Sequence, residues 1–173
     1  MHAALRLTLA SLALGACFML PAEATSPKQG SIASTHARNI ASWFPGRMIG
    51  TPAEMLSADY LRQQFAQMGY QSDIRAFNSR YRYTTKDNHT SWHNVTGSTV
   101  IAAHEGKAPQ EIVIIAHLDT YAPQSDIDVE KNLGGLTLQG IDDNAAGLGI
   151  MLELADALKS VPTAYGIRFV ATS

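Results

Sequence analysis

Apolar residues recur along the chain with two different periods, and these periods predict an alternation of strands and helices. Residues 112–116 form a short continuous apolar run, and residues 167–171 form a second run that is apolar except for Arg168; both are typical of strands buried on both faces of a sheet. Residues 144–159, between the two runs, carry an amphipathic helical pattern. Its apolar face is formed by Leu148, Met151, Leu152, Ala155 and Leu158. A strand–helix–strand unit of this kind indicates an α/β domain with a mixed, largely parallel sheet.

Two more helices are expected before this unit. The first covers residues 34–44 and is stopped by a proline–glycine pair. The second begins after Thr51, which suits the N-cap, with Pro52 at the first helical position and Glu54 completing a capping box. Gly69 is expected to end this second helix.

The remaining segments are expected to form strands and a long loop. Residues 70–85 and 93–103 are rich in aromatic and β-branched residues and indicate two strands. Residues 120–140 are polar and glycine-rich and are expected to form a loop.

Composition limits the size and class of the protein. A chain of 173 residues is long enough for one domain. Its 13 Lys and Arg against 15 Asp and Glu give a net charge of -2, which argues against a nucleic-acid partner. The single cysteine, Cys17, excludes a disulfide scaffold and a cysteine-built zinc site.

The N-terminus has the pattern of an export signal. Arg6 precedes a largely apolar stretch of 14 residues at 7–20, too short for a membrane span of roughly 20 residues. Small residues then follow at an expected cleavage site, so residues 1–24 are predicted to be a signal peptide. The mature chain, residues 25–173, is expected in the periplasm and off the membrane. A lipoprotein anchored at Cys17 and a buried N-terminal helix are the alternatives.

Histidine and carboxylates lie at both ends of the predicted loop. Residues 116–120 read AHLDT and place His117 and Asp119 just after a buried strand. Residues 140–147 read GIDDNAAG and lead into the amphipathic helix. Sites in open α/β sheets form beyond the carboxyl ends of the strands, so both segments are expected at one rim.

The residue types at this rim suit a hydrolytic zinc site. Zinc binds histidine and carboxylates, and a histidine ligand usually donates its other N–H to a carboxylate, a role that Asp119 can fill for His117. Asp142 offers two oxygens, enough to bridge two cations. Alternatively, His117 and Asp119 form a surface pair, and Asp142 and Asp143 form a helix N-cap cluster.

Taken together, these motifs resemble the secreted di-zinc aminopeptidases, a family that includes bacterial leucyl aminopeptidases, aminopeptidase Y and glutamate carboxypeptidase II. The segments FPGR at 44–47 and SWHNVTGS at 91–98 share in the resemblance. It implies a zinc-dependent exopeptidase fold with helices on both faces of the sheet. It also implies that His117 is a zinc ligand, that Asp142 bridges two zinc ions and that Asp119 is the carboxylate that orients His117. A cis peptide is implied between Asp142 and Asp143.

The resemblance also implies an activity. The complete protein is expected to remove N-terminal residues, arginine above all, from a peptide or protein with a free N-terminus, by attack of a metal-activated hydroxide. Alkaline phosphatase is the implied substrate. The chain matches the N-terminal part of such an enzyme: a Glu-Glu pair and two further ligands are expected beyond Ser173. The 173-residue chain alone is therefore expected to be inactive.

Two other functions remain open from the sequence. A related co-catalytic zinc carboxypeptidase or deacylase shares the His-x-Asp motif and a bridging aspartate. A non-catalytic module of the same fold would need neither His117 nor Asp142.

Overall fold

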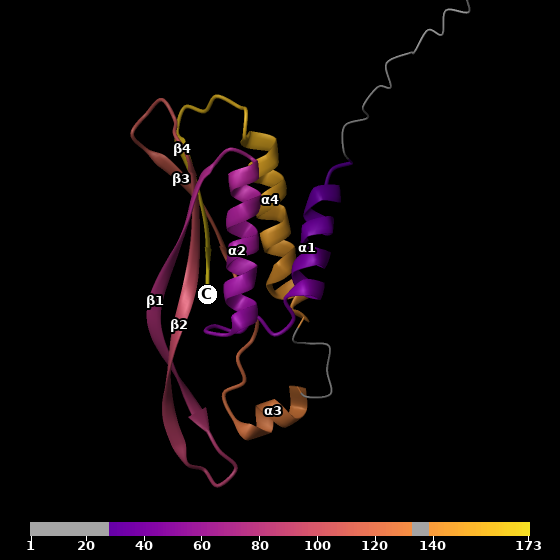
Figure 1. Cartoon of the computed structure of the whole chain (residues 1–173), viewed down its shortest axis with the longest axis vertical. Helices are drawn as coiled ribbons and strands as arrows, with labels where there is room; N and C mark the ends of the chain where they lie inside the picture. The colour runs from indigo at the N-terminus through magenta and orange to yellow at the C-terminus, as the bar shows by residue number, and fades with distance from the viewer. Residues whose placement is uncertain (1–27, 133–138) are drawn as a thin grey trace, which may run out of the picture.

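The computed structural model describes residues 28–132 and 139–173 (Figure 1). The predicted signal peptide, residues 1–24, lies outside these ranges. The helices are α1 (Ser31–Trp43), α2 (Pro52–Gln67), α3 (Asp126–Asn132) and α4 (Ala146–Leu158). The strands are β1 (Gln71–Thr84), β2 (Thr90–His104), β3 (Glu111–His117) and β4 (Gly166–Thr172). Within the described ranges, no helix is long and apolar enough to cross a membrane.

The strands form one mixed sheet in the order β1-β2-β4-β3. Strands β1 and β2, and β2 and β4, pair antiparallel, whereas β3 and β4 pair parallel. The α/β class with a mixed sheet is confirmed, with its parallel pairing located in the strand–helix–strand unit. In the β3–β4 register His117 stands opposite Thr172, at the carboxyl end of both strands.

The helices α1, α2 and α4 lie on one side of the sheet in Figure 1. The core between them and the sheet includes an aromatic cluster of Phe65, Tyr70 and Phe169, with ring centroids 5.4–6.0 Å apart. Met151 and Leu152 of α4 are buried with it, as the helical period predicts. The apolar face of α4 therefore packs against β3 and β4.

The N-terminus of α2 follows the predicted capping pattern in one direction. The Thr51 hydroxyl accepts a hydrogen bond from the Glu54 backbone N–H at 3.2 Å. The Glu54 carboxylate does not complete the box; it is buried and accepts hydrogen bonds from the Ser98 N–H at 2.7 Å and the Ser173 hydroxyl at 2.6 Å. Glu54 thus ties α2 to β2 and to the end of β4.

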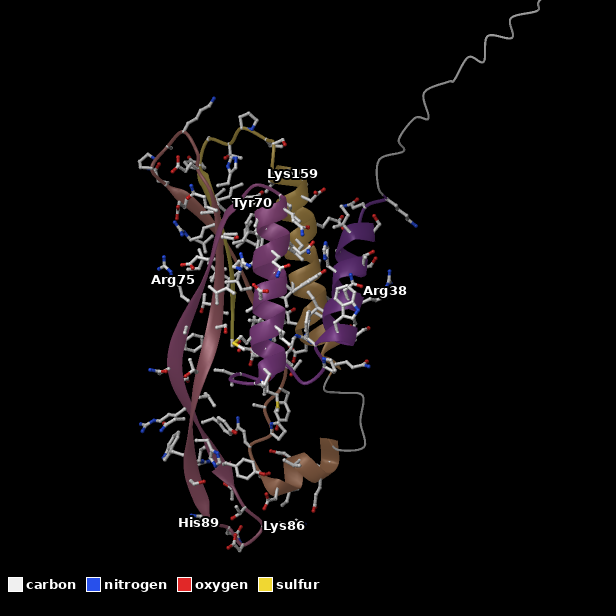
Figure 2. The ribbon with its side chains drawn as sticks, in the orientation of Figure 1. Arg38, Tyr70, Arg75, Lys86, His89 and Lys159 are labelled. Carbon is white, nitrogen blue, oxygen red and sulfur yellow. The ribbon has the colours of Figure 1, made fainter. Side chains whose placement is uncertain are left out.

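The predicted loop at residues 120–140 contains a short helix that the sequence pattern did not indicate. Helix α3 lies beside the tip of the β1–β2 hairpin, near Lys86 and His89 in Figure 2. Asp126 accepts hydrogen bonds from the Tyr83 hydroxyl and the Lys86 N–H, both at 2.8 Å. Asp126 therefore stabilises the hairpin tip.

Strand β3 is not buried on both faces, so this part of the expectation is wrong. The exposed fractions of Ile112, Val113 and Ile115 are 52%, 50% and 67%. The reason is that β3 is the edge strand of the described sheet, with α4 reaching it from one side. Its outer backbone edge and its apolar side chains are both accessible.

Such an edge predicts self-association, because an apolar edge strand pairs readily with another chain. We expect residues 25–173, expressed alone, to form concentration-dependent oligomers in sedimentation velocity, and Ile115→Lys to shift them toward monomers. Met55→Lys is the matched control, because Met55 is 60% exposed on α2. A parent chain that stays monomeric at high concentration would contradict the prediction.

Candidate functional site

His117 lies at the rim predicted for the site, at the last position of β3. Its Nδ1 is 3.1 Å from the backbone oxygen of Asp119 and 3.5 Å from the Asp119 carboxylate. Its Nε2 is 2.8 Å from the Asp143 carboxylate. The structure thus brings His117, Asp119 and Asp143 together from both ends of the long loop.

Oxygen acceptors face both ring nitrogens of His117. A neutral imidazole has one N–H, so it can donate to one acceptor and must receive at its other nitrogen. With Nδ1–H given to Asp119, the Nε2 lone pair would face a carboxylate. This contact is favourable when the ring carries a second proton, or when a cation is shared between Nε2 and Asp143.

The contact with His117 is made by Asp143 and not by Asp142. Both aspartates are exposed and lie in the irregular turn η2 (Ile141–Ala145), in which Asp143 and Asn144 have non-helical dihedral angles. The cis peptide joins Asp143 to Asn144, one bond later than the resemblance implies.

Asn144 fixes the start of α4 next to this contact. Its side-chain oxygen accepts a hydrogen bond from the Gly147 N–H at 3.2 Å, and its amide donates to the His117 backbone oxygen at 3.4 Å. The N-terminus of α4 therefore lies beside His117, where the helix dipole favours negative charge.

Arg47 is a site residue that sequence reasoning missed. Its side chain is fully buried and donates to three backbone oxygens: Nε to Leu118 at 3.1 Å, Nη1 to Gln139 at 2.6 Å and Nη2 to Gly140 at 2.7 Å. Burial lowers the pKa of Arg47 to about 10, against the attraction of the Asp119 and Asp143 carboxylates. Arg47 is therefore a cation at neutral pH. In the sequence, Arg47 stands out only as part of the FPGR segment that shares in the resemblance.

Gly140 lets the two loops approach each other closely. Its φ is +55°, and a Cβ there would lie 2.5 Å from the Thr120 methyl carbon and 2.6 Å from the Asp143 backbone oxygen. Thr120 in turn donates its backbone N–H to the Arg47 oxygen at 2.9 Å. The glycine is thus required by space as well as by backbone conformation.

The described residues supply part of a metal site. Imidazole nitrogen and carboxylate oxygen are both zinc ligands, so His117 and Asp143 fit zinc in kind. Across residues 28–132 and 139–173, however, no group of three or more His, Cys, Asp or Glu side chains is close enough to hold a metal ion. The predicted ligand Asp142 is not brought to His117.

A charged hollow lies at the other end of the sheet and is separate from this rim. It is lined by residues that include Arg75, labelled in Figure 2, and Arg168. Arg168 is held there by two hydrogen bonds to Glu111, at 2.8 and 2.7 Å. None of the site residues predicted from the sequence lines this hollow.

The fold is also found in zinc exopeptidases of known structure, and part of the sequence matches a peptidase family. Residues 99–173, which include His117 and Asp143, match the model of Peptidase family M28. Over all 173 residues the chain is 75% identical to the alkaline phosphatase isozyme conversion protein of Escherichia coli (strain K12). The chain spans about half of that relative, 50% of its length.

Solved structures with the same fold include two kinds of enzyme. The zinc aminopeptidase BSAP of Bacillus subtilis superposes with a TM-score of 0.63 and 14% identity, over 84% of this chain and 61% of that one. A leucine aminopeptidase precursor of Bacteroides thetaiotaomicron gives 0.56 and 21%, over 81% and 45%. The glutaminyl cyclase of Fimbriiglobus ruber gives 0.59 and 19%, over 85% and 46%. At these identities the likeness shows the fold alone.

Proposed function

We propose that the complete protein is a zinc aminopeptidase that removes N-terminal residues from a peptide or protein. The observation that carries this proposal is His117, held at the end of β3 with Nδ1 against Asp119 and Nε2 against Asp143. The match of residues 99–173 to a peptidase family supports the reaction class.

In this proposal His117 and Asp143 hold the metal, and the complete site binds two zinc ions. Zinc, when bound, lowers the pKa of a water molecule and polarises the scissile carbonyl. The contribution of this chain is orientation. Asp119 holds Nδ1 so that Nε2 projects toward Asp143, which lies just before the N-terminus of α4.

The substrate is proposed from the relative at 75% identity, whose name refers to conversion of alkaline phosphatase isozymes. We infer a protein substrate with a free N-terminus, alkaline phosphatase, from which arginine is removed. The signal-like pattern at residues 1–24 supports export to the periplasm. N-terminal sequencing of the exported protein tests this point: Thr25 is the expected first residue, and a lipidated Cys17 would contradict it.

The proposed activity is tested with the full-length protein and three substrates. Metal content is measured first, with two zinc ions per chain expected. Arginine release is then followed from an arginyl amide with a free N-terminus, from the same substrate with a blocked N-terminus, and from a peptide that begins with glutamine. Hydrolysis of the free substrate alone supports an aminopeptidase.

The other outcomes of this test identify competing functions. Release of the blocking group would indicate a deacylase, and a carboxypeptidase would turn over neither form of the amide, because both lack a free carboxyl terminus. Ring closure of the glutamine peptide without hydrolysis would indicate a glutaminyl cyclase, the activity named for some structures of this fold. Absence of zinc and of turnover would indicate a non-catalytic module.

A prediction for Asp119 follows from its place behind His117. In the full-length protein Asp119→Asn should retain zinc but lose activity by about 10–100-fold, as is typical when a partner of a metal ligand is changed. The backbone oxygen of Asp119 remains as an acceptor at 3.1 Å, so the imidazole is misoriented rather than released. Full activity of Asp119→Asn with normal zinc content would show that Asp119 has no orienting role.

A further inference from the structure

The buried cation Arg47 joins two segments that lie far apart in the sequence. Its guanidinium donates to Leu118, next to His117, and to Gln139 and Gly140, which precede the turn of Asp143. The backbone of Arg47 also takes part, because its carbonyl accepts the Thr120 N–H at 2.9 Å. One residue therefore contacts the loops on both sides of the His117–Asp143 pair.

The positions of the three backbone oxygens require an arginine, and a lysine would not replace it. The three acceptors are backbone oxygens of irregular segments, and a buried carbonyl without a partner is costly. A guanidinium has five N–H donors in a rigid fork and can reach all three at once. A lysine ammonium is a compact charge on a flexible stem and cannot reproduce this arrangement.

The charge of Arg47 and its hydrogen bonds have opposite effects on the affinity of the site for a metal ion. A buried cation near Asp119 and Asp143 attracts both carboxylates and repels a metal cation that would bind them. Its hydrogen bonds, by contrast, hold the two loops in place before any metal arrives. The two effects predict opposite signs for the metal affinity of an uncharged variant.

We propose that Arg47 is a positioning residue of the metal site: its buried guanidinium fixes the loop after β3 and the turn before α4 so that His117 and Asp143 face each other. This inference rests on the proposed zinc site. For zinc affinity, the hydrogen bonds of Arg47 outweigh its repulsion of the metal. Without them, binding of the metal would itself have to order His117 and Asp143.

The test uses the full-length protein with two substitutions. Arg47→Lys keeps the charge and loses the fork, and Arg47→Gln loses the charge and keeps two N–H donors. Zinc affinity of the metal-free proteins is measured by competition with a chromophoric chelator. Both variants should bind zinc about 10–100-fold more weakly, the range seen when the partner of a ligand is removed.

A second measurement does not depend on zinc. Amide hydrogen exchange of the metal-free variants should be faster at residues 117–120 and 139–145 and unchanged in the β1–β2 hairpin. Leu61→Ala is the control, because Leu61 is fully buried in α2 and makes none of the hydrogen bonds that hold these loops. It should lower the melting temperature without weakening zinc binding.

Four results would overturn the positioning role. One is zinc affinity of Arg47→Lys equal to that of the wild type, and another is tighter binding by Arg47→Gln, which would mean that charge repulsion dominates. The third is an equal loss of affinity in Leu61→Ala, and the fourth is failure of both Arg47 variants to fold. Either of these last two would make Arg47 a stability residue only. A wild-type protein that binds no zinc would instead refute the proposed function, and the exchange data would still decide whether Arg47 holds the loops.

Discussion

Replacing Asp143 by asparagine in the full-length protein should abolish zinc-dependent aminopeptidase activity, whereas Asp142→Asn should leave most of it. Asp143 is the aspartate that meets His117, with 2.8 Å between its carboxylate oxygen and Nε2. A bound metal ion stabilises the transition state by several kcal/mol, which is lost when a ligand no longer holds the metal, and each 1.36 kcal/mol is a factor of ten. We therefore expect a loss of about 10³-fold or more for Asp143→Asn.

The measurements are zinc content and kcat/KM on an arginyl amide, with circular dichroism to show that both variants fold. His117→Ala is the positive control and should lose zinc and activity together. The resemblance alone places the bridging carboxylate at Asp142. If Asp142→Asn lost activity and Asp143→Asn kept it, that placement would be right and the geometric one wrong.

The location of the site could be predicted because it follows from strand direction alone. An apolar strand ending in His117 and a helix beginning after Asp143 must present these residues at the same edge of the sheet. The choice between Asp142 and Asp143 could not be predicted in this way. It depends on the left-handed Gly140 and on the non-helical turn that follows, which set the direction of each side chain.

Arg47 could not be found from local pattern either. Its three hydrogen-bond acceptors lie 71 to 93 positions away in the sequence, and a single arginine between two predicted helices has no periodicity to interpret. Its partners are backbone oxygens, so no complementary charge in the sequence points to it. The burial of β3 was overestimated for a related reason, because an apolar run records the tendency to be buried and not which elements cover it.

The importance of Gly140 could not be predicted from local sequence either. Its two roles, a left-handed backbone and close contact with its neighbours, can be separated by experiment. In a loop rich in glycine the sequence does not distinguish it, but its φ of +55° and its close neighbours do. A left-handed conformation costs an alanine about 1–2 kcal/mol. Substitution of Gly69 by alanine would carry only this conformational cost, because the φ of Gly69 is +90° and nothing lies within 4 Å of the position of a Cβ there.

Gly140→Ala should therefore destabilise the full-length protein more than Gly69→Ala and should also weaken zinc binding. A Cβ at Gly140 would be 2.5 Å from Thr120 and 2.6 Å from the Asp143 oxygen, and overpacking of this kind adds about 1–3 kcal/mol. Relief of the clash must move the backbone at Asp143, because a backbone oxygen cannot rotate away as a side chain can. We expect urea denaturation to show the larger loss of stability for Gly140→Ala, and chelator competition to show weaker zinc binding in that variant alone. Equal stability losses with unchanged zinc affinity would mean that the two loops tolerate separation and that the His117–Asp143 contact does not depend on their close approach.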